Sequence, residues 1–144
     1  MTGHVIAAAL GTAAFALLFD VPDRFYFLCA LIGGAGFWLY EWLRSLGLSS
    51  TEATFFATVV VMLLSRFSAV WRRCPVTVFL IAGIIPLVPG AGIYWTAYSL
   101  VVGETAAALE SGFAAIRAAI AIVLGIVVVF ELPNKLFHIR LRKG

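Results

Sequence analysis

The stretch Cys74–Val102 reads CPVTVFLIAGIIPLVPGAGIYWTAYSLVV and is apolar except for a break in its middle. The break is Pro86-Leu87-Val88-Pro89-Gly90-Ala91-Gly92, with two prolines and two glycines close together. A continuous helix would lose backbone hydrogen bonds here, because proline has no N–H and its ring displaces the carbonyl four residues earlier. We therefore expect two half-helices joined by an unwound segment, with the carbonyls of Ala82 and Ile85 left without partners.

A broken apolar helix indicates a transport function. In lipid, freed backbone carbonyls are tolerated only where they are buried in protein or line a wet cavity. Discontinuous helices of this kind form substrate and ion sites in secondary transporters. A second interpretation stays open, in which the kink serves packing only, because proline is frequent in membrane helices.

The composition predicts an all-α integral membrane protein. Of the 144 residues, 63% are hydrophobic and 12% are charged, far less polar surface than a soluble domain of this size needs. We expect residues 1–144 to form a single polytopic membrane domain. The net charge of +3 does not indicate nucleic-acid binding, because the basic residues mark membrane orientation instead. Neither the two cysteines nor the two histidines have metal or redox spacing, so no metal or cofactor is expected.

Hydrophobic segments predict five transmembrane helices, the fourth of them broken at the Pro-Leu-Val-Pro-Gly segment. The first is short for a span of about 20 residues, and Ser50 or Thr51 is the expected cap of the third. The predicted spans are residues 5–19, 25–43, 53–71, 76–102 (broken) and 111–132, followed by a basic cytoplasmic tail at 133–144.

The distribution of basic residues predicts the orientation. With five spans, Arg24, the Arg72-Arg73 pair and the basic tail lie on one side, while Arg44 is the only basic residue on the other. The positive-inside rule then places the N-terminus outside and the C-terminus in the cytoplasm. Four spans, with the first segment lying at the interface, would spoil this bias.

The break supplies the candidate substrate-binding groups. The half-helix that starts near Gly90 to Gly92 would direct free N–H groups at a substrate carboxylate. Backbone carbonyls before it would receive an ammonium group or a coupling cation. Arg117 would compensate an anionic substrate, although snorkelling to the membrane surface is an equal alternative. The candidate residues are Ala82, Ile85, Pro86, Pro89, Gly90, Gly92, Tyr94, Thr96 and Arg117. There is no P-loop, HExxH motif or nucleophile–base pair, so an enzyme is not expected.

The residues of the break resemble a family signature. Cys74-Pro75, Gly83, the run Pro86 to Gly90, and Tyr94 resemble the signature of the threonine/serine exporter (ThrE) family. Upstream, Phe19-Asp20-Val21-Pro22 is similar to that family's Phe-Asn-Val-Pro turn, with Asp20 in place of the usual asparagine. The likeness extends from about residue 14 to residue 132, and it is closest to the small-subunit, or C-terminal membrane-module, type.

This resemblance implies a multi-pass exporter of threonine or serine in the bacterial inner membrane, working with a larger ThrE-type partner subunit. Related members export dicarboxylates such as succinate, which is one alternative. A second alternative is a non-transporting subunit that assembles or stabilises the complex. Dense glycine and alanine faces also leave homo-oligomers open. The sequence does not choose among these substrates and roles.

Overall fold

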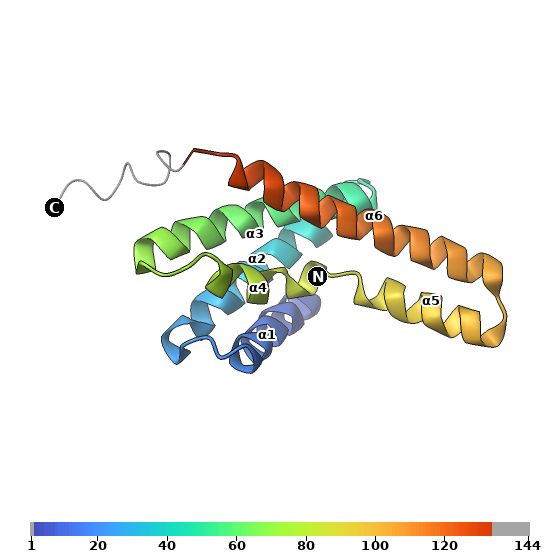
Figure 1. The fold of residues 1–144 in the computed structure, drawn as a ribbon, viewed down its shortest axis with the longest axis horizontal. Helices are drawn as coiled ribbons and strands as arrows, with labels where there is room; N and C mark the ends of the chain where they lie inside the picture. The colour runs from blue at the N-terminus through green and yellow to red at the C-terminus, as the bar shows by residue number, and fades with distance from the viewer. Residues whose placement is uncertain (1, 134–144) are drawn as a thin grey trace.

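The computed structural model describes residues 2–133, and all regular structure in this range is helical (Figure 1). Most of the predicted basic tail therefore lies outside the described residues. The helices are α1 (Thr2–Leu18), α2 (Tyr26–Ser45), α3 (Ser50–Arg72), α4 (Thr77–Ile84), α5 (Gly90–Val102) and α6 (Thr105–Phe130), with the 3₁₀ turns η1 (Asp23–Phe25) and η2 (Ile85–Leu87).

The described helices agree with a membrane protein. Three of them are long and apolar enough to cross a bilayer: α2 extended by η1, α3 and α6. The pair Thr77–Leu87 and Gly90–Val102 qualifies as a fourth when taken together, and it is bent by 49°. At 17 residues, α1 is shorter than the usual span. The all-helical membrane architecture is thus supported, while the count of five spans stays a prediction.

Two helix starts differ from the predicted ones. The cap of α3 is Ser49, not Ser50 or Thr51: the Ser49 side chain accepts from the N–H of Glu52, and the Glu52 carboxylate accepts from the N–H of Ser49 at 2.8 Å. This reciprocal arrangement needs a three-residue spacing, which only Ser49 offers. The last helix begins at Thr105 instead of residue 111. Its first turns are rich in alanine, the strongest helix former.

Four helices end on a residue with left-handed backbone, at Asp20, Gly47, Arg73 and Gly103. After each of these residues, the next N–H bonds back to a carbonyl five positions earlier, as for Val21 to Ala16 at 3.0 Å. This geometry satisfies the last carbonyls of a helix. Asparagine and aspartate both tolerate a positive φ, so Asp20 keeps the turn that the family's asparagine would make.

The core lies around α3, which packs against α2, α4 and α6. Small residues set the close approach of these helices: a Cβ added at Gly36 of α2 would collide with the side chain of Val61. Where η1 meets α4, the rings of Phe25 and Phe79 pack edge to face with centroids 5.2 Å apart. The start of α1 is tied to the end of α2 by His4 Nδ1 and Glu41 Oε1, 2.6 Å apart.

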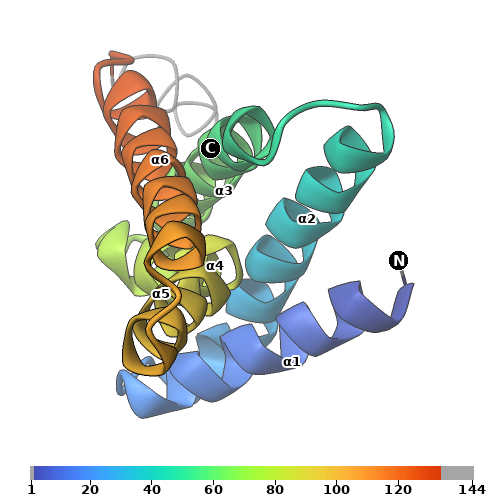
Figure 2. The same ribbon diagram turned by 90° about the vertical axis from the view of Figure 1, so that its right-hand side faces the viewer.

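Helices α3 and α6 run in the same direction. Gly125 lies against Thr58, whereas Arg66 donates to the carbonyls of Val129 and Leu132, so residue numbers rise together along both helices. The chain between them, α4 through α5, therefore has to return over the full length of the bundle (Figures 1 and 2). Helix α5 packs chiefly on the first half of α6, and this hairpin projects beyond the other helices (Figure 1).

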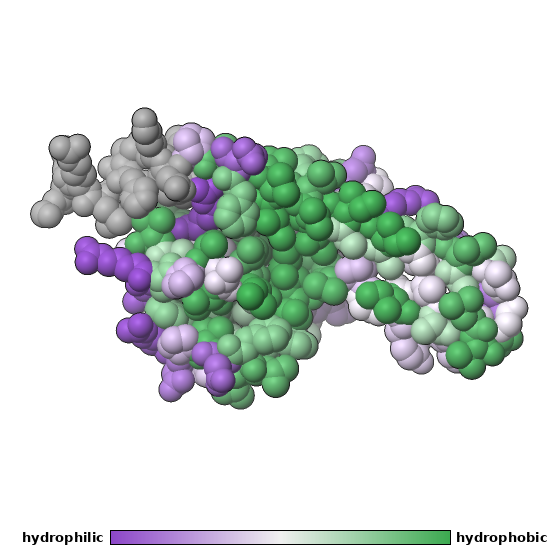
Figure 3. All heavy atoms as spheres, in the orientation of Figure 1, coloured by the Kyte–Doolittle hydropathy of each residue, from purple (hydrophilic) through white to green (hydrophobic). Residues whose placement is uncertain are grey.

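The surface is polar at one end of the bundle and apolar over its middle. Figure 3 shows hydrophilic residues gathered at the end where α3 terminates, next to a broad apolar band. Arg24 of the α1–α2 turn and Arg72 of α3 both lie near Cys74 at this end. Burial raises the pKa of the Cys74 thiol, and the two arginines oppose that shift. Two of the basic groups used to predict orientation are thus neighbours in space.

Candidate functional site

A cavity of about 290 Å³ opens at the break between α4 and α5. The break itself forms one wall, the end of α2 and the start of α3 form the second, and the middle of α6 forms the third. The lining residues are Phe37, Tyr40, Ser50, Thr54, Pro86, Leu87, Val88, Pro89, Ala91, Gly92, Ala114, Ala115 and Ala118.

The carbonyls before the break are bonded differently from the prediction. The Ile85 N–H donates to Ala82 O, and the Val88 N–H donates to Ile85 O at 3.1 Å. The expectation that both carbonyls lack partners was therefore wrong, because the chain tightens into a 3₁₀ turn with bonds three residues apart. With bonds three residues apart, the Pro86 carbonyl would accept from residue 89, but Pro89 has no N–H to donate. Within residues 2–133 the Pro86 carbonyl accepts no backbone hydrogen bond outside its helix, and it belongs to a cavity-lining residue.

The N-terminus of α5 faces the cavity without a side-chain cap. Pro89 is its N-cap residue, and no side chain bonds to the first N–H groups. The Gly90 N–H donates to Val88 O at 2.7 Å, which leaves the N–H groups of Ala91 and Gly92 beside the cavity. These groups carry the positive end of the helix dipole. Gly92 also lets α5 approach α6, since an added Cβ would lie 3.2 Å from the Ala115 Cβ.

Three hydroxyl groups face this helix end from α2 and α3. Tyr40 Oη and Ser50 Oγ are hydrogen-bonded at 3.0 Å, and Thr54 Oγ1 donates to the Ser50 carbonyl at 2.8 Å. Sequence reasoning did not select these residues for the site. The only available signal was their position, because Tyr40 lies in the last two turns of α2 and Ser50 begins α3. Among the described residues, no charged side chain lines the cavity.

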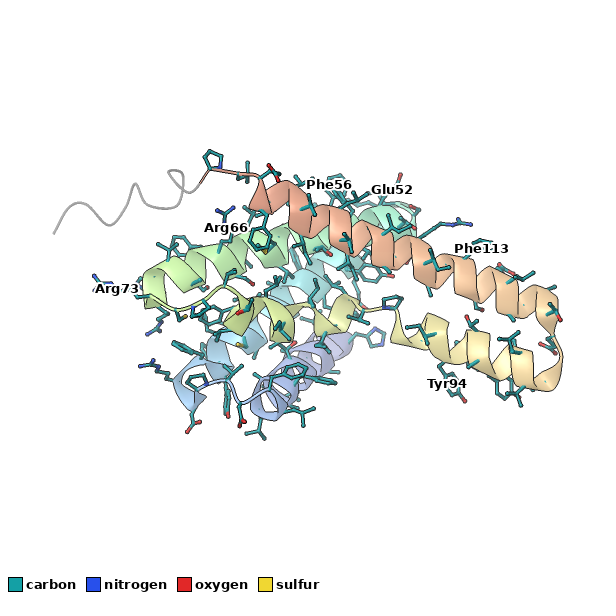
Figure 4. The ribbon with its side chains drawn as sticks, in the orientation of Figure 1. Glu52, Phe56, Arg66, Arg73, Tyr94 and Phe113 are labelled. Carbon is teal, nitrogen blue, oxygen red and sulfur yellow. The ribbon has the colours of Figure 1, made fainter. Side chains whose placement is uncertain are left out.

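The structure brings together three of the nine predicted site residues, Pro86, Pro89 and Gly92. Ala82 is buried and borders a separate cavity of about 200 Å³ next to the turn at Asp20 to Pro22. Tyr94 is exposed and points away from α6 (Figure 4). The remaining residues do not line the cavity: Ile85 is half-buried within η2, Gly90 is exposed, Thr96 borders a small groove between α5 and α6, and Arg117 borders a groove between α3 and α6.

A comparison with protein families identifies the group to which the sequence belongs. The family described as threonine/serine exporter, ThrE, matches residues 4–131. The chain belongs to the ThrE family. The match confirms the resemblance seen in the Pro86 to Gly90 segment and includes every cavity-lining residue. The ThrE family is one of transporters, which is consistent with the expectation of a protein that is not an enzyme. No solved structure matches this ThrE chain significantly.

Proposed function

We propose that this chain is a membrane subunit of a secondary exporter of small amino acids, threonine or serine, in the bacterial inner membrane. The observation that carries the proposal is the cavity at the α4–α5 break, which combines an uncapped helix N-terminus with hydroxyl groups. Binding sites for small molecules are typically concave, with a few polar groups that converge on the ligand. The size of the cavity, about 290 Å³, suits a small amino acid.

The cavity offers a partner for each group of a hydroxy amino acid. The N–H groups of Ala91 and Gly92 would bind the carboxylate, as helix N-termini bind anions. The Pro86 carbonyl would accept from the ammonium group, and the pair Tyr40–Ser50 would bind the hydroxyl. Within the described part of the chain, the lining has no cationic side chain to balance a second carboxylate, which favours an amino acid over a dicarboxylate such as succinate.

The proposed topology has five crossings, with the N-terminus outside and the C-terminus in the cytoplasm. The parallel course of α3 and α6 supports it, because the bent α4–α5 pair then crosses between them. Cys74 provides a test in a Cys29→Ala background, where it is the only thiol. An impermeant maleimide should label Cys74 in inside-out vesicles and not in spheroplasts. The reaction is run at about pH 8.5, because the thiolate is the reactive form and burial raises the pKa of Cys74. Labelling in spheroplasts would reverse the orientation.

We further propose that a larger ThrE-type subunit completes the transporter. The test is efflux of preloaded labelled serine, threonine and succinate from a host without related exporters, with this chain expressed alone or with the partner. Efflux of serine or threonine that needs both chains and stops when the proton gradient is collapsed would support the proposal. Efflux of succinate alone would contradict the proposed substrate. No efflux of any of the three, with both chains verified in the membrane, would favour an assembly subunit.

A further inference from the structure

A second recess lies on the opposite side of α6 from α5, in the groove between α3 and α6. Its volume is about 450 Å³, and its floor is formed by apolar side chains that include Phe55 and Phe56 of α3 and Ile120 and Leu124 of α6. At its rim lie Thr51 and Arg117. Figure 4 shows the neighbouring Glu52 and Phe56 together at the start of α3, where it meets α6.

Arg117 brings a positive charge to this groove, which Glu52 of α3 also lines. It is exposed, and it makes no ion pair or hydrogen bond with any of residues 2–133. The Oε2 of Glu52 accepts from the Ser49 N–H and Oγ, each at 2.8 Å, and Glu52 forms no ion pair with Arg117. The ion pair with Glu110 that the shared helix face would allow does not form either. The guanidinium is therefore available to an external anion.

Arg117 lies level with the first turn of α3, near one end of that helix. Helix α3 has 23 residues and is about 35 Å long, close to the thickness of a hydrocarbon core of about 30 Å, so its first turn lies near the membrane surface. Arg117 borders the groove beside Thr51, in that first turn. Ile120 and Leu124 follow roughly one and two turns further along α6, toward the hydrocarbon. The groove thus carries the positive charge of Arg117 at one end and is lined by apolar side chains beyond it.

We propose that this groove binds a membrane phospholipid, with the phosphate on Arg117 and an acyl chain along Phe55, Phe56, Ile120 and Leu124. Charge and polarity both match this occupant: guanidinium groups bind phosphate through paired N–H donors, and an apolar groove accommodates a hydrocarbon chain. We expect an anionic lipid to bind better than a zwitterionic one, because its net negative charge is attracted to the Arg117 guanidinium. This proposal does not depend on the transported substrate.

The test is native mass spectrometry of the purified full-length chain in detergent, titrated with dioleoylphosphatidylglycerol. We expect one tightly held lipid, with roughly fivefold weaker binding in Arg117→Gln. Arg117→Lys should retain part of the affinity. The matched control is Arg72→Gln, an exposed arginine at the opposite end of the bundle that should leave this lipid in place. Filling the groove with Leu124→Trp should also weaken binding.

Three results would overturn the proposal. Equal lipid binding by Arg117→Gln and the unmodified chain would remove Arg117 from any lipid site. Arg117-dependent binding of inorganic phosphate, with lipid binding unaffected by Leu124→Trp, would assign a simple anion site. A chain that dimerises in an Arg117-dependent way and holds no lipid would mean that a carboxylate of a second copy occupies the groove.

Discussion

The body around α3 and the projecting α5–α6 hairpin differ in how far they bury their apolar surface. In the most apolar 18-residue window, 56% of α3 is buried within the chain, against 22% of α6. Helix α5 leaves large side chains exposed, including Trp95 and Val101. Helix α6 is the more apolar of the two helices and still buries less of its surface within the chain. The body is stabilised by the chain itself, whereas the hairpin depends on lipid or another membrane protein for cover.

The break joins these two regions, and changing it has the largest expected effect. In Pro89→Ala/Gly90→Ala, residue 89 regains an N–H that can bond to Ile85 O and extend the helix through the cavity wall. We expect efflux in the presence of the partner to fall about a hundredfold, as when binding groups are misplaced by about 1 Å. The amount of chain in the membrane should be unchanged.

Gly90→Ala alone is the control, because a Cβ at this position meets no neighbouring atom. It should retain efflux close to that of the unmodified chain. Normal efflux from the double variant would show that the break serves packing only.

The second prediction concerns the end of the body, where Arg66 is buried against the last turn of α6. Arg66→Met would remove the donor to the carbonyls of Val129 and Leu132. We expect the free energy of unfolding in detergent to fall by about 2 kcal/mol, because buried acceptors lose their partner. Phe67→Leu, at an exposed neighbouring position, should change it little. Equal stability of Arg66→Met and Phe67→Leu would mean that Arg66 does not hold α6 on α3.

The third prediction contrasts the tightly packed contact between α2 and α3 with the less crowded break between α4 and α5. In Gly36→Ala the new methyl group collides with Val61, and overpacking of this kind costs about 1–2 kcal/mol of unfolding free energy. Gly90→Ala serves again for comparison and should be neutral or slightly stabilising. Thermal unfolding of both variants in the same detergent measures the difference. A smaller loss for Gly36→Ala than for Gly90→Ala would contradict the packing of α2 against α3.

The smallest expected effect is on selectivity, at the hydroxyl pair between the two regions. Tyr40→Phe keeps the ring and removes the Oη that bonds to Ser50. If the pair binds the substrate hydroxyl, the preference for threonine over valine should fall about threefold, the worth of one modest hydrogen bond. Competition between the two amino acids in the efflux assay measures this ratio. The same ratio in Tyr40→Phe would place the hydroxyl of the substrate elsewhere.

Local sequence features predicted an all-helical membrane protein correctly. Pro86 and Pro89 interrupt an apolar run, and this chemistry acts within a few residues, so it can be deduced without a structure. The partnering of the carbonyls could not, because the choice between bonds three and four residues apart depends on how η2 fits against α2. That choice gives Ala82 and Ile85 partners and leaves the Pro86 carbonyl as the one at the break that accepts no backbone hydrogen bond within residues 2–133.

The walls of the site depend on contacts between distant segments. Tyr40 and Ser50 reach the cavity only because α2 and α3 pack side by side against the break. Arg117 is a sequence candidate for compensating an anionic substrate, with snorkelling as an equal alternative, but helical spacing does not say which neighbour a side chain meets. The structure places it in the groove with α3 instead.

The parallel pairing of α3 and α6 also dictates an order of events during synthesis. Arg66 and Val129 are 63 positions apart, and everything between them has to leave the insertion machinery before they meet. Until then the face of α3 that receives α6 is open to lipid, and the Arg66 side chain lacks the carbonyls of Val129 and Leu132. Helix α6 therefore packs onto α3 last. A ribosome stalled before residue 105 would leave a chain with an uncovered face of α3, which chaperones and membrane proteases can recognise.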